Sequence, residues 1–311
     1  MNDFDNIHLK DTSTIQRAKA SPKVFIVLVN WNGWHHTRNC LRSLKNLDYP
    51  DYRIIVVDNG STDDSVQSLS RLKCDFTLLT TKKNLGFAGG SNVGIRHAQS
   101  CGSEYVWLLN NDTEVYTNAL SAMVTLAESD PTIGAVGSIL LEHTCENKVQ
   151  VWGGGRVNLW SGLARQHSGR VAADEVHYLV GASLLVKCAA LENTGLLDED
   201  FFLYWEDADF CFRLRAYGWK LAVAEDSLVR HRGNASLESG NPLWDLFFTM
   251  SSKRFFRRHA RVPVIPILLG AAARSIRRAL RGEGKNICAL WKGVCVNKTS
   301  LLESSRKESM Q

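Results

Sequence analysis

Short apolar runs alternate with amphipathic helical patterns along the first 140 residues, and this alternation restricts the fold more than any other feature of the sequence. Strands that alternate with helices favour a mostly parallel sheet covered by helices on both faces. We therefore expect an α/β fold. The predicted strands are 23–29, 53–57, 76–80, 105–109 and 133–140, and helical patterns occupy about 37–44, 66–72, 92–99 and 117–127.

The alternation stops after residue 140. Residues 142–178 are rich in Gly, Arg and His, which predicts loops or a small irregular sheet. Beyond this segment we expect strands at 180–186 and 220–224 and a helix at 205–216, followed by His231 in a polar loop.

Composition is typical of a globular protein, because 311 residues with 44% hydrophobic side chains can bury a full core. The first 20 residues are polar and mixed in charge. We therefore expect residues 1–21 to form a poorly ordered leader and not a signal peptide. We accordingly expect the catalytic part in the cytoplasm. The eight cysteines are widely spaced, without a Cys-x-x-Cys pair, and are interpreted as reduced thiols.

Positive charge is concentrated near the C-terminus. Residues 253–285 contain ten Lys or Arg and one acid, Glu283, whereas the rest of the chain has 27 basic and 31 acidic residues. Such a block can bind nucleic acid or an anionic membrane surface. The sequence contains no recognisable nucleic-acid-reading module, so no nucleic-acid partner is expected.

The run Val-Trp-Leu-Leu-Asn-Asn-Asp at 106–112 is a buried strand pattern that ends abruptly in polar side chains. Such a strand should carry Asp112 to the C-terminal edge of the sheet, where open α/β sheets bind ligands and a metal-bound diphosphate would fit. The alternative is that Asp112 only forms a turn or caps the helix that begins near Thr117.

Asp58 ends the second predicted strand and precedes a helix start, a position from which a carboxylate can contact a ribose or base. The Gly-x-Gly-x-x-Gly fingerprint of dinucleotide sites is missing after the first strand. A glycine cluster at 86–94 has different spacing; it either lets backbone approach a phosphate or serves tight packing.

A second acidic cluster lies at Glu206, Asp207 and Asp209. Asp209 has the spacing of a helical ion pair with Arg213, so it is interpreted as structural. Glu206 and Asp207 lie next to aromatic residues that lower the local polarity, which favours one of them as a general base. A solvated helix start is the alternative interpretation.

Five ordered motifs resemble those of the inverting family 2 glycosyltransferases, especially the bacterial rhamnosyltransferase-like members that build cell-surface polysaccharides. The resemblance spans about residues 24–231. Its motifs are VLVNWN at 27–32, VVDNGSTD at 56–63, NLGFAGGSN at 84–92, LLNND at 108–112 and DEDFFLYWEDAD at 198–209.

The resemblance implies a GT-A nucleotide-sugar-binding fold with Asp58 at the nucleotide and Asp112 at a divalent cation, Mg²⁺ or Mn²⁺. Asp207 would be the catalytic base, beside Glu206, and His231 would be a second contact to the metal or diphosphate. Asn110 replaces the first carboxylate of the Asp-x-Asp pattern of many relatives, which should weaken metal binding. The other donor-side residues would be Asn30, Asn32, Asn84, Gly89, Asn92, Asn110 and Asn111, and the acceptor-side residues Tyr204 and Trp205.

The same resemblance implies a division of the chain. Residues 22–240 would form the glycosyltransferase domain, with a nucleotide-sugar-binding half at 22–140 and an acceptor and catalytic half at 141–240. Residues 241–311 would form a helical, basic tail.

The tail contains an amphipathic helical pattern between residues 265 and 281. Twelve apolar residues with two prolines, at 262–273, are too few for the roughly 20 of a membrane span. We therefore expect peripheral attachment; the alternative is a helix packed on this domain or on a second subunit, with its arginines in solvent. One face carries Ile265, Leu268, Leu269, Ala272, Ile276 and Leu280, and the opposite face carries Arg274, Arg277, Arg278 and Arg281.

Together these patterns predict an inverting glycosyltransferase at the inner face of the cell membrane. It would move a sugar to a lipid-linked or oligosaccharide acceptor, and the resemblance suggests rhamnose from dTDP-rhamnose as the donor. The alternatives are a nucleotidyltransferase that uses the same site and an inactive sugar-nucleotide- or polysaccharide-binding module. A homo-oligomer is possible.

Overall fold

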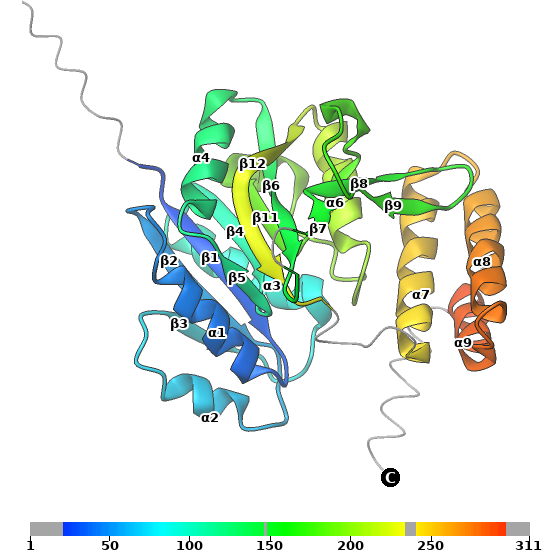
Figure 1. The fold of residues 1–311 in the computed structure, drawn as a ribbon, viewed down its shortest axis with the longest axis horizontal. Coiled ribbons are helices and arrows are strands. Elements are labelled where there is room, and N and C mark those ends of the chain that lie inside the picture. Colours follow the sequence, from blue (N-terminus) through cyan, green and yellow to red (C-terminus); the bar gives the residue numbers. More distant parts are fainter. Residues whose placement is uncertain (1–20, 146–147, 234–240, 297–311) are drawn as a thin grey trace, which may run out of the picture.

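A computed structural model describes residues 21–145, 148–233 and 241–296. Its main sheet has nine strands, with eight in the order β3-β2-β1-β4-β11-β6-β12-β5 and β7 paired to β6 (Figure 1). A second sheet has the order β10-β8-β9. The predicted leader, apart from its last residue, lies outside the described residues.

The strands are β1 (Val24–Asn30), β2 (Tyr52–Asp58), β3 (Thr77–Thr80), β4 (Tyr105–Asn110), β5 (Thr113–Val115), β6 (Ile133–Glu142), β7 (Val149–Trp152), β8 (Gly154–Val157), β9 (Ala164–Gln166), β10 (Tyr178–Leu179), β11 (Ser183–Lys187) and β12 (Lys220–His231). The α-helices are α1 (Trp34–Leu44), α2 (Ser65–Ser70), α3 (Gly86–Ser100), α4 (Ala119–Ser129), α5 (Cys188–Thr194), α6 (Glu206–Ala216), α7 (Pro242–His259), α8 (Val264–Ala279) and α9 (Gly284–Cys295). A short 3₁₀ turn covers Ala173–Glu175.

The first strands pair in parallel, as the alternation predicts. β1 lies between β2 and β4 and is parallel to both, and β3 extends this arrangement beyond β2. β11 then inserts antiparallel between β4 and β6. Within the segment 142–178, predicted to form loops or a small irregular sheet, β8 and β9 form the three-stranded sheet with β10, whereas β7 joins β6 of the main sheet.

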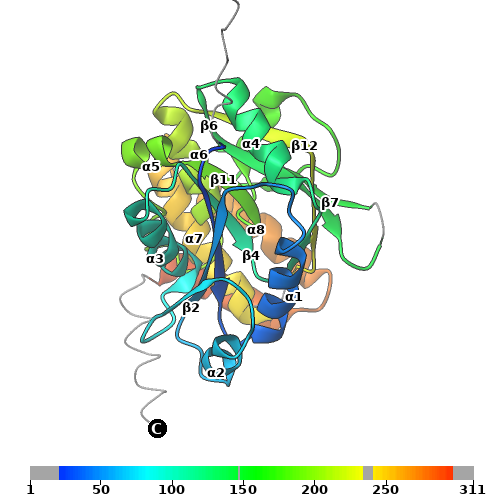
Figure 2. The ribbon, with the colours of Figure 1, turned by 90° about the vertical axis from the view of Figure 1, so that its left-hand side faces the viewer.

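The central strands are apolar throughout because both faces of the sheet are covered. Along β1, Phe25 and Val27 join one core, whereas Ile26 and Leu28 join the other. The first core includes side chains of α3, α5, α6 and α7, and the second includes side chains of α1, α2 and α4. Figure 2 shows α3 and α5 on one side of the sheet and α1 on the other.

The prediction of a polar loop at His231 is wrong. β12 continues from Lys220 to His231, and its pairing with β6 shifts register between Ala224 and Leu228. This irregularity interrupts the apolar pattern after Ala224, which is why the sequence pattern predicts a strand that ends there.

The three C-terminal helices pack beside the sheet domain, and α7 is part of its core. Phe255 and Phe256 are fully buried against the first core. Buried Asp245 of α7 joins Arg278 of α8 by an ion pair of 3.0 Å and accepts a hydrogen bond of 2.8 Å from Asn286 of α9. Among the described residues, no helix is both long enough and apolar enough to cross a membrane.

Close packing of α3 on β1 depends on Gly94. A Cβ at this position would lie 2.3 Å from Val27 Cγ1. Alanine is the better helix former by about 1 kcal/mol, but the overlap should outweigh that gain. We expect Gly94→Ala to lower the free energy of unfolding by about 1–3 kcal/mol in urea titrations.

Gly284→Ala is the matched control, because an added Cβ at this first residue of α9 meets no atom within 4 Å. It should leave stability unchanged or slightly increased. Equal stability of the two variants would show that α3 can move away from β1 at no cost.

Candidate active site at the C-terminal edge of the sheet

Parallel register brings the ends of the first strands together. Asn30 at the end of β1 lies opposite Asp58 at the end of β2, and Val29 lies opposite Asn110 at the end of β4. Side chains predicted from three separate motifs therefore meet at one edge of the sheet, where open α/β sheets bind ligands.

Asp58 organises the turn after β2. It is buried, and it accepts hydrogen bonds from Asn30 Nδ2 (2.8 Å), from Ser61 Oγ (2.7 Å) and from the Ser61 backbone N–H (3.0 Å). Asn32 Oδ1 accepts from the N–H of Thr62 in the same turn (2.7 Å). These contacts fix the loop that would face a nucleotide. A direct contact between Asp58 or Asn32 and a nucleotide stays a prediction.

The motif at 84–92 connects α3 to other parts of the site. The Asn84 carboxamide oxygen accepts from the Gly86 N–H (2.8 Å), while Gly89 packs on Leu85. Buried Asn92 reaches a distant loop, because its Nδ2 donates to the Leu197 carbonyl (2.8 Å) and its Oδ1 accepts from the Leu197 N–H (3.1 Å). A contact between these residues and the sugar nucleotide also stays a prediction.

Asn111 extends the network from the end of β4 to α1. Its Nδ2 donates to Thr37 Oγ1 at 3.0 Å, and the Thr37 hydroxyl donates to Asn30 Oδ1 at 2.8 Å. The ends of β1 and β4 are therefore connected by side chains as well as by strand pairing.

Asp112 and His231 form a pair of donor atoms suited to a cation. His231 Nε2 lies 3.4 Å from Asp112 Oδ1 and 3.3 Å from Asn110 Nδ2. His231 Nδ1 lies 2.8 Å from Gln150 Oε1, an oxygen that accepts an N–H hydrogen bond, and this contact fixes the imidazole with Nε2 toward Asp112. Such orientation of a histidine by its second nitrogen is typical of metal ligands.

The donor set fits a hard divalent cation that is held partly by substrate. Mg²⁺ uses one or two protein carboxylates with waters and phosphate oxygens, so a single protein carboxylate can suffice. The described residues contain no cluster of three or more His, Cys, Asp or Glu that would form a complete protein cage. Burial alone would raise the pKa of Asp112, but the hydrogen bond and charge of His231 bring it below its ordinary value.

Asp207 is held at the N-terminus of α6 by backbone donors. Its Oδ2 accepts from the Gly181 N–H (2.9 Å) and its Oδ1 accepts from the Ala208 N–H (2.7 Å). Burial raises the pKa of Asp207, and these N–H groups oppose that rise. Glu206 is more deeply buried, and one of its oxygens has no hydrogen-bond partner among the described residues.

The segment before Asp207 has an unusual backbone. Tyr204 and Trp205 both have positive φ angles, of 67° and 70°. Bulky side chains rarely adopt this conformation, and strained residues of this kind cluster at functional sites. Trp205 is buried against aromatic rings of α7, which leaves little of its surface for a ligand, whereas Tyr204 is only partly buried.

The structure brings the two acidic sites to one place. The connection between β10 and β11 donates to Asp207 through the Gly181 N–H, and the next residue, Ala182, accepts from the Asn110 N–H at 3.0 Å. Asp112 follows Asn110 by two residues. Asp112 and Asp207, almost a hundred residues apart in sequence, therefore lie on either side of one short connection.

The predicted pair of Asp209 and Arg213 is confirmed at 2.9 Å and belongs to a larger network. Asp209 is completely buried and also binds Arg258 (2.8 Å) and His259 (2.9 Å) of α7. Burial would raise the pKa of Asp209, but these partners lower it below its ordinary value. The network anchors the helix that carries Asp207.

Sequence reasoning missed Gln150 and Gly181. Both act through contacts with residues far away in the chain, and neither belongs to a recognisable motif. Only the glycine at position 181, inside the predicted strand at 180–186, gave a weak signal of close backbone approach.

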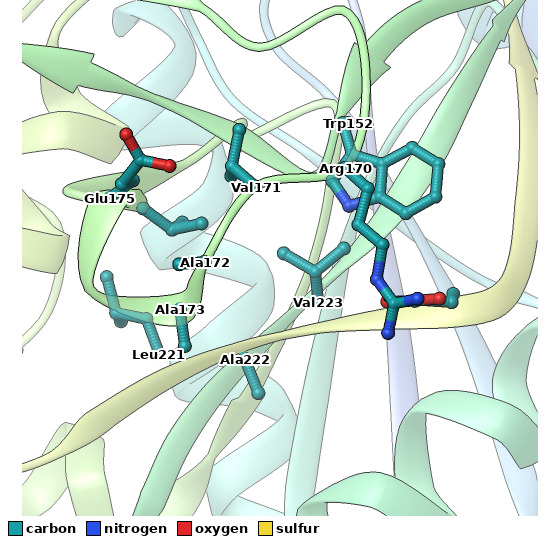
Figure 3. A pocket seen from close by; sticks show the side chains of 11 residues that line it. Trp152, Arg170, Val171, Ala172, Ala173, Glu175, Leu221, Ala222 and Val223 are labelled. Atoms are coloured by element: carbon teal, nitrogen blue, oxygen red, sulfur yellow. The ribbon is translucent and has the colours of Figure 1, made fainter.

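A separate cavity of about 650 Å³ lies along the first half of β12, between Val223 and the segment at 170–176 (Figure 3). Trp152 and the exposed Arg170, which pairs with Glu225 at 2.8 Å, line it. None of the predicted site residues lines this cavity, and His231 ends the other half of the same strand.

Comparison with known proteins points to one family. The sequence profile of glycosyl transferase family 2 matches residues 25–195. N-acetylglucosaminyl-diphospho-decaprenol L-rhamnosyltransferase of Mycobacterium tuberculosis is 26% identical over 235 residues, which cover 68% of this chain and 76% of that protein. The low-salt glycan biosynthesis hexosyltransferase Agl10 of Haloferax volcanii is 24% identical over 61% of each chain.

Solved structures show the same fold. The mannosyltransferase PcManGT from Pyrobaculum calidifontis, in complex with GDP-Man and Mn²⁺, superposes with a TM-score of 0.56 at 19% identity, covering 93% of this chain and 81% of that one. The predicted GT-A fold is thus confirmed.

The buried Glu206 carboxyl predicts a pH dependence of stability. Burial raises its pKa well above the ordinary value of 4.5, and the charge of Asp207 raises it further. Above pH 4.5 the folded state keeps a proton that the unfolded state loses, so stability falls as pH rises through the folded pKa. Glu206→Gln should therefore be more stable than wild type at pH 8, by on the order of 1 kcal/mol for each unit of raised pKa, and not at pH 4.

Thermal unfolding at both pH values measures this difference. Glu192→Gln, which removes an exposed carboxylate on α5, is the control and should show no pH-dependent gain. A Glu206→Gln variant that is less stable than wild type at pH 8 would contradict the raised pKa.

Proposed function

This chain belongs to glycosyl transferase family 2, and from that premise we propose that it moves a sugar from a nucleoside-diphosphate donor to a lipid-linked or oligosaccharide acceptor in cell-surface glycan synthesis. The enzyme class is glycosyltransferase. The further choice of rhamnose, carried by dTDP-rhamnose, is supported by the resemblance to a rhamnosyltransferase that is 26% identical.

The observation that carries this proposal is the position of Asp207 beside the end of β4. One oxygen of its carboxylate accepts from Gly181, and the following residue pairs with Asn110 at the edge where Asp112 lies. A donor whose diphosphate occupied the Asp112 side would present its anomeric carbon toward the Asp207 side. We assign Asp207 as the base and Asp112 to the diphosphate.

Partial burial suits Asp207 to this role. A carboxylate with a raised pKa holds a proton more strongly, so it accepts one more readily from an acceptor hydroxyl. The hydroxyl oxygen then forms a bond to the anomeric carbon as the bond to the diphosphate breaks, with inversion. The proton stays on Asp207 and no covalent intermediate is needed. Burial and the charge of Asp207 raise the pKa of Glu206, which favours its neutral form beside the Asp207 carboxylate.

Donor binding is assigned to the strand ends. Asp58 with Asn30 and Asn32 would form the nucleotide side, because their turn is fixed by the hydrogen bonds described above. Asp112 and His231 would hold Mg²⁺ or Mn²⁺. When bound, the cation would neutralise the charge that develops on the departing nucleoside diphosphate.

On the acceptor side we assign Tyr204 as the stacking residue. Its ring is partly exposed and lies 5.5 Å from the ring of Trp244 in α7, so two aromatic side chains are available near Asp207. Trp205 would support this aromatic surface by packing on the ring of Phe248.

We also propose that the protein works in the cytoplasm at the inner face of the cell membrane, attached peripherally. The basic excess of the C-terminal helices and a lipid-linked acceptor support this location.

Substitution of the proposed base tests the assignment. Asp207→Asn should retain donor affinity, measured by calorimetry, while release of nucleoside diphosphate falls by about 10²–10⁴-fold. The assay incubates purified protein with a panel of nucleotide sugars and Mg²⁺ or Mn²⁺. The control is Asp174→Asn, which replaces an exposed carboxylate outside the proposed site. This variant should release nucleoside diphosphate at the normal rate.

Loss of both affinity and turnover in Asp207→Asn would indicate a structural role. Donor binding without turnover in the wild type would identify a binding module, and release of pyrophosphate in place of nucleoside diphosphate would identify a nucleotidyltransferase.

The orientation of His231 gives a second prediction. Gln150→Leu removes the acceptor that fixes the imidazole, so Mn²⁺ affinity in the presence of a nucleoside diphosphate should fall about 10–100-fold. His231→Ala should lose at least as much. Binding followed by electron paramagnetic resonance provides the measurement, and unchanged Mn²⁺ affinity in both variants would exclude His231 as a ligand.

A further inference from the structure

An amphipathic helix on a globular domain usually turns its apolar face inward. The helix α8 turns arginine side chains inward instead. Arg274 lies over the ring of Phe248 at 4.8 Å, and Arg278 lies over the ring of Trp244 at 5.7 Å. Arg278 also pairs with Asp245 (3.0 Å) and Glu283 (2.6 Å). Two of the four arginines predicted for the polar face thus point toward α7.

The apolar face consequently points outward. Leu268, Leu269, Ile276 and Leu280 have exposed fractions of 45%, 52%, 62% and 83%, and Val264 is 59% exposed. With the exposed Ala272, residues 264, 268, 272, 276 and 280 recur every four residues, so they form a continuous stripe along α8 and its C-cap. Large apolar side chains scattered singly on a surface are ordinary, but a continuous stripe marks an interaction site.

The tip of the β8–β9 hairpin packs on the face of α8 opposite this stripe, at Pro266 and Gly270. The connection from β8 to β9 reaches over α7 to α8 (Figure 1), and Gly162 is packed so closely that a Cβ would meet the Pro266 carbonyl. Next to this contact, Trp160 is 61% exposed and Leu163 is 44% exposed. The Asn158 side chain accepts from the Trp160 N–H at 2.9 Å, which fixes the turn that presents the tryptophan.

Exposed basic residues accompany this apolar surface. Within the described part of α8, α9 and their connection, the single acid is Glu283, which is already paired with Arg278. Arg277 and Arg281 lie at the end of the stripe, and α9 adds exposed Trp291 between its own lysines. The exposed basic residues are Arg261, Arg277, Arg281, Lys285 and Lys292.

We propose that the outer face of α8 and the outer side of α9 together bind the surface of an anionic lipid bilayer. Apolar side chains and an exposed tryptophan would enter the interface while the basic residues contact the headgroups. A second copy of the chain fits less well, because a symmetric contact would bring two basic surfaces together. This inference rests on the proposed function and names the surface through which it operates.

Packing joins this surface to the catalytic segment. Arg274 of α8 covers Phe248, and Phe248 contacts the rings of Tyr204 (6.0 Å) and Trp205 (5.5 Å), which precede Asp207. A bilayer bound to the outer side of α8 would therefore have a fixed orientation relative to the acceptor side of the active site. A lipid-linked acceptor could then reach Asp207 without leaving the membrane.

Vesicle flotation of the full chain tests the surface. Leu268→Ser/Ile276→Ser/Leu280→Ser should weaken binding to phosphatidylglycerol-containing vesicles at least about tenfold, because three exposed apolar side chains are removed. Arg277→Gln/Arg281→Gln should weaken it about tenfold at low salt and less at high salt. Val66→Ser/Tyr217→Ser, which removes comparably exposed side chains elsewhere, is the control and should bind like wild type.

Release of nucleoside diphosphate in solution separates this inference from the proposed function. All these variants should retain it, because none of the substituted residues touches the active site. Equal flotation of wild type and the triple variant would contradict the proposed membrane surface. It would also be contradicted if the wild type bound no vesicles and formed a dimer that dissociates in the triple variant. Vesicle binding without donor turnover would support the surface and contradict the proposed activity.

Discussion

The site depends on the backbone hydrogen bond from Gly181 to the Asp207 carboxylate. This contact joins the N-terminus of α6 to the connection that leads into β11, and that connection pairs with the end of β4 through Ala182 and Asn110. Because β11 enters the sheet antiparallel between β4 and β6, its start lies at the edge where the parallel strands end. The topology therefore places Asp207, which belongs to the second half of the chain, at the sheet edge formed by strands of the first half.

The C-terminal helices are part of the same construction. Asp209, two residues after Asp207, pairs with Arg258 and His259 of α7, and the Ser251 hydroxyl donates to the Leu203 carbonyl at 2.8 Å. These contacts hold a segment whose backbone at Tyr204 and Trp205 is costly by about 1–3 kcal/mol per residue. Since α7 provides the compensating contacts, the predicted division between domain and tail at residue 240 does not coincide with a break in packing.

Local patterns were enough to predict the strand ends but not the contacts between distant segments. Asn30, Asp58 and Asn110 each follow an apolar run, and parallel pairing places such residues at one edge. Gln150 could not be found this way, because its role comes from meeting His231 about eighty residues later. His231 itself was misplaced in a loop, since the register shift in β12 hides the strand from a periodicity analysis.

The orientation of α8 shows a related limit. Periodicity identifies which residues share a face of a helix, but the partners decide which face turns inward. Here buried Asp245 of α7 requires a positive partner, because an unpaired buried carboxylate would be very costly. Arg278 supplies it, and its guanidinium also lies over the ring of Trp244. Once this pair fixes the rotation of α8, the leucines and isoleucine on the other side have no protein to pack on within the described part of the chain. Their exposure is thus a consequence of the Asp245 charge, and a lipid surface is the partner that their basic surroundings favour.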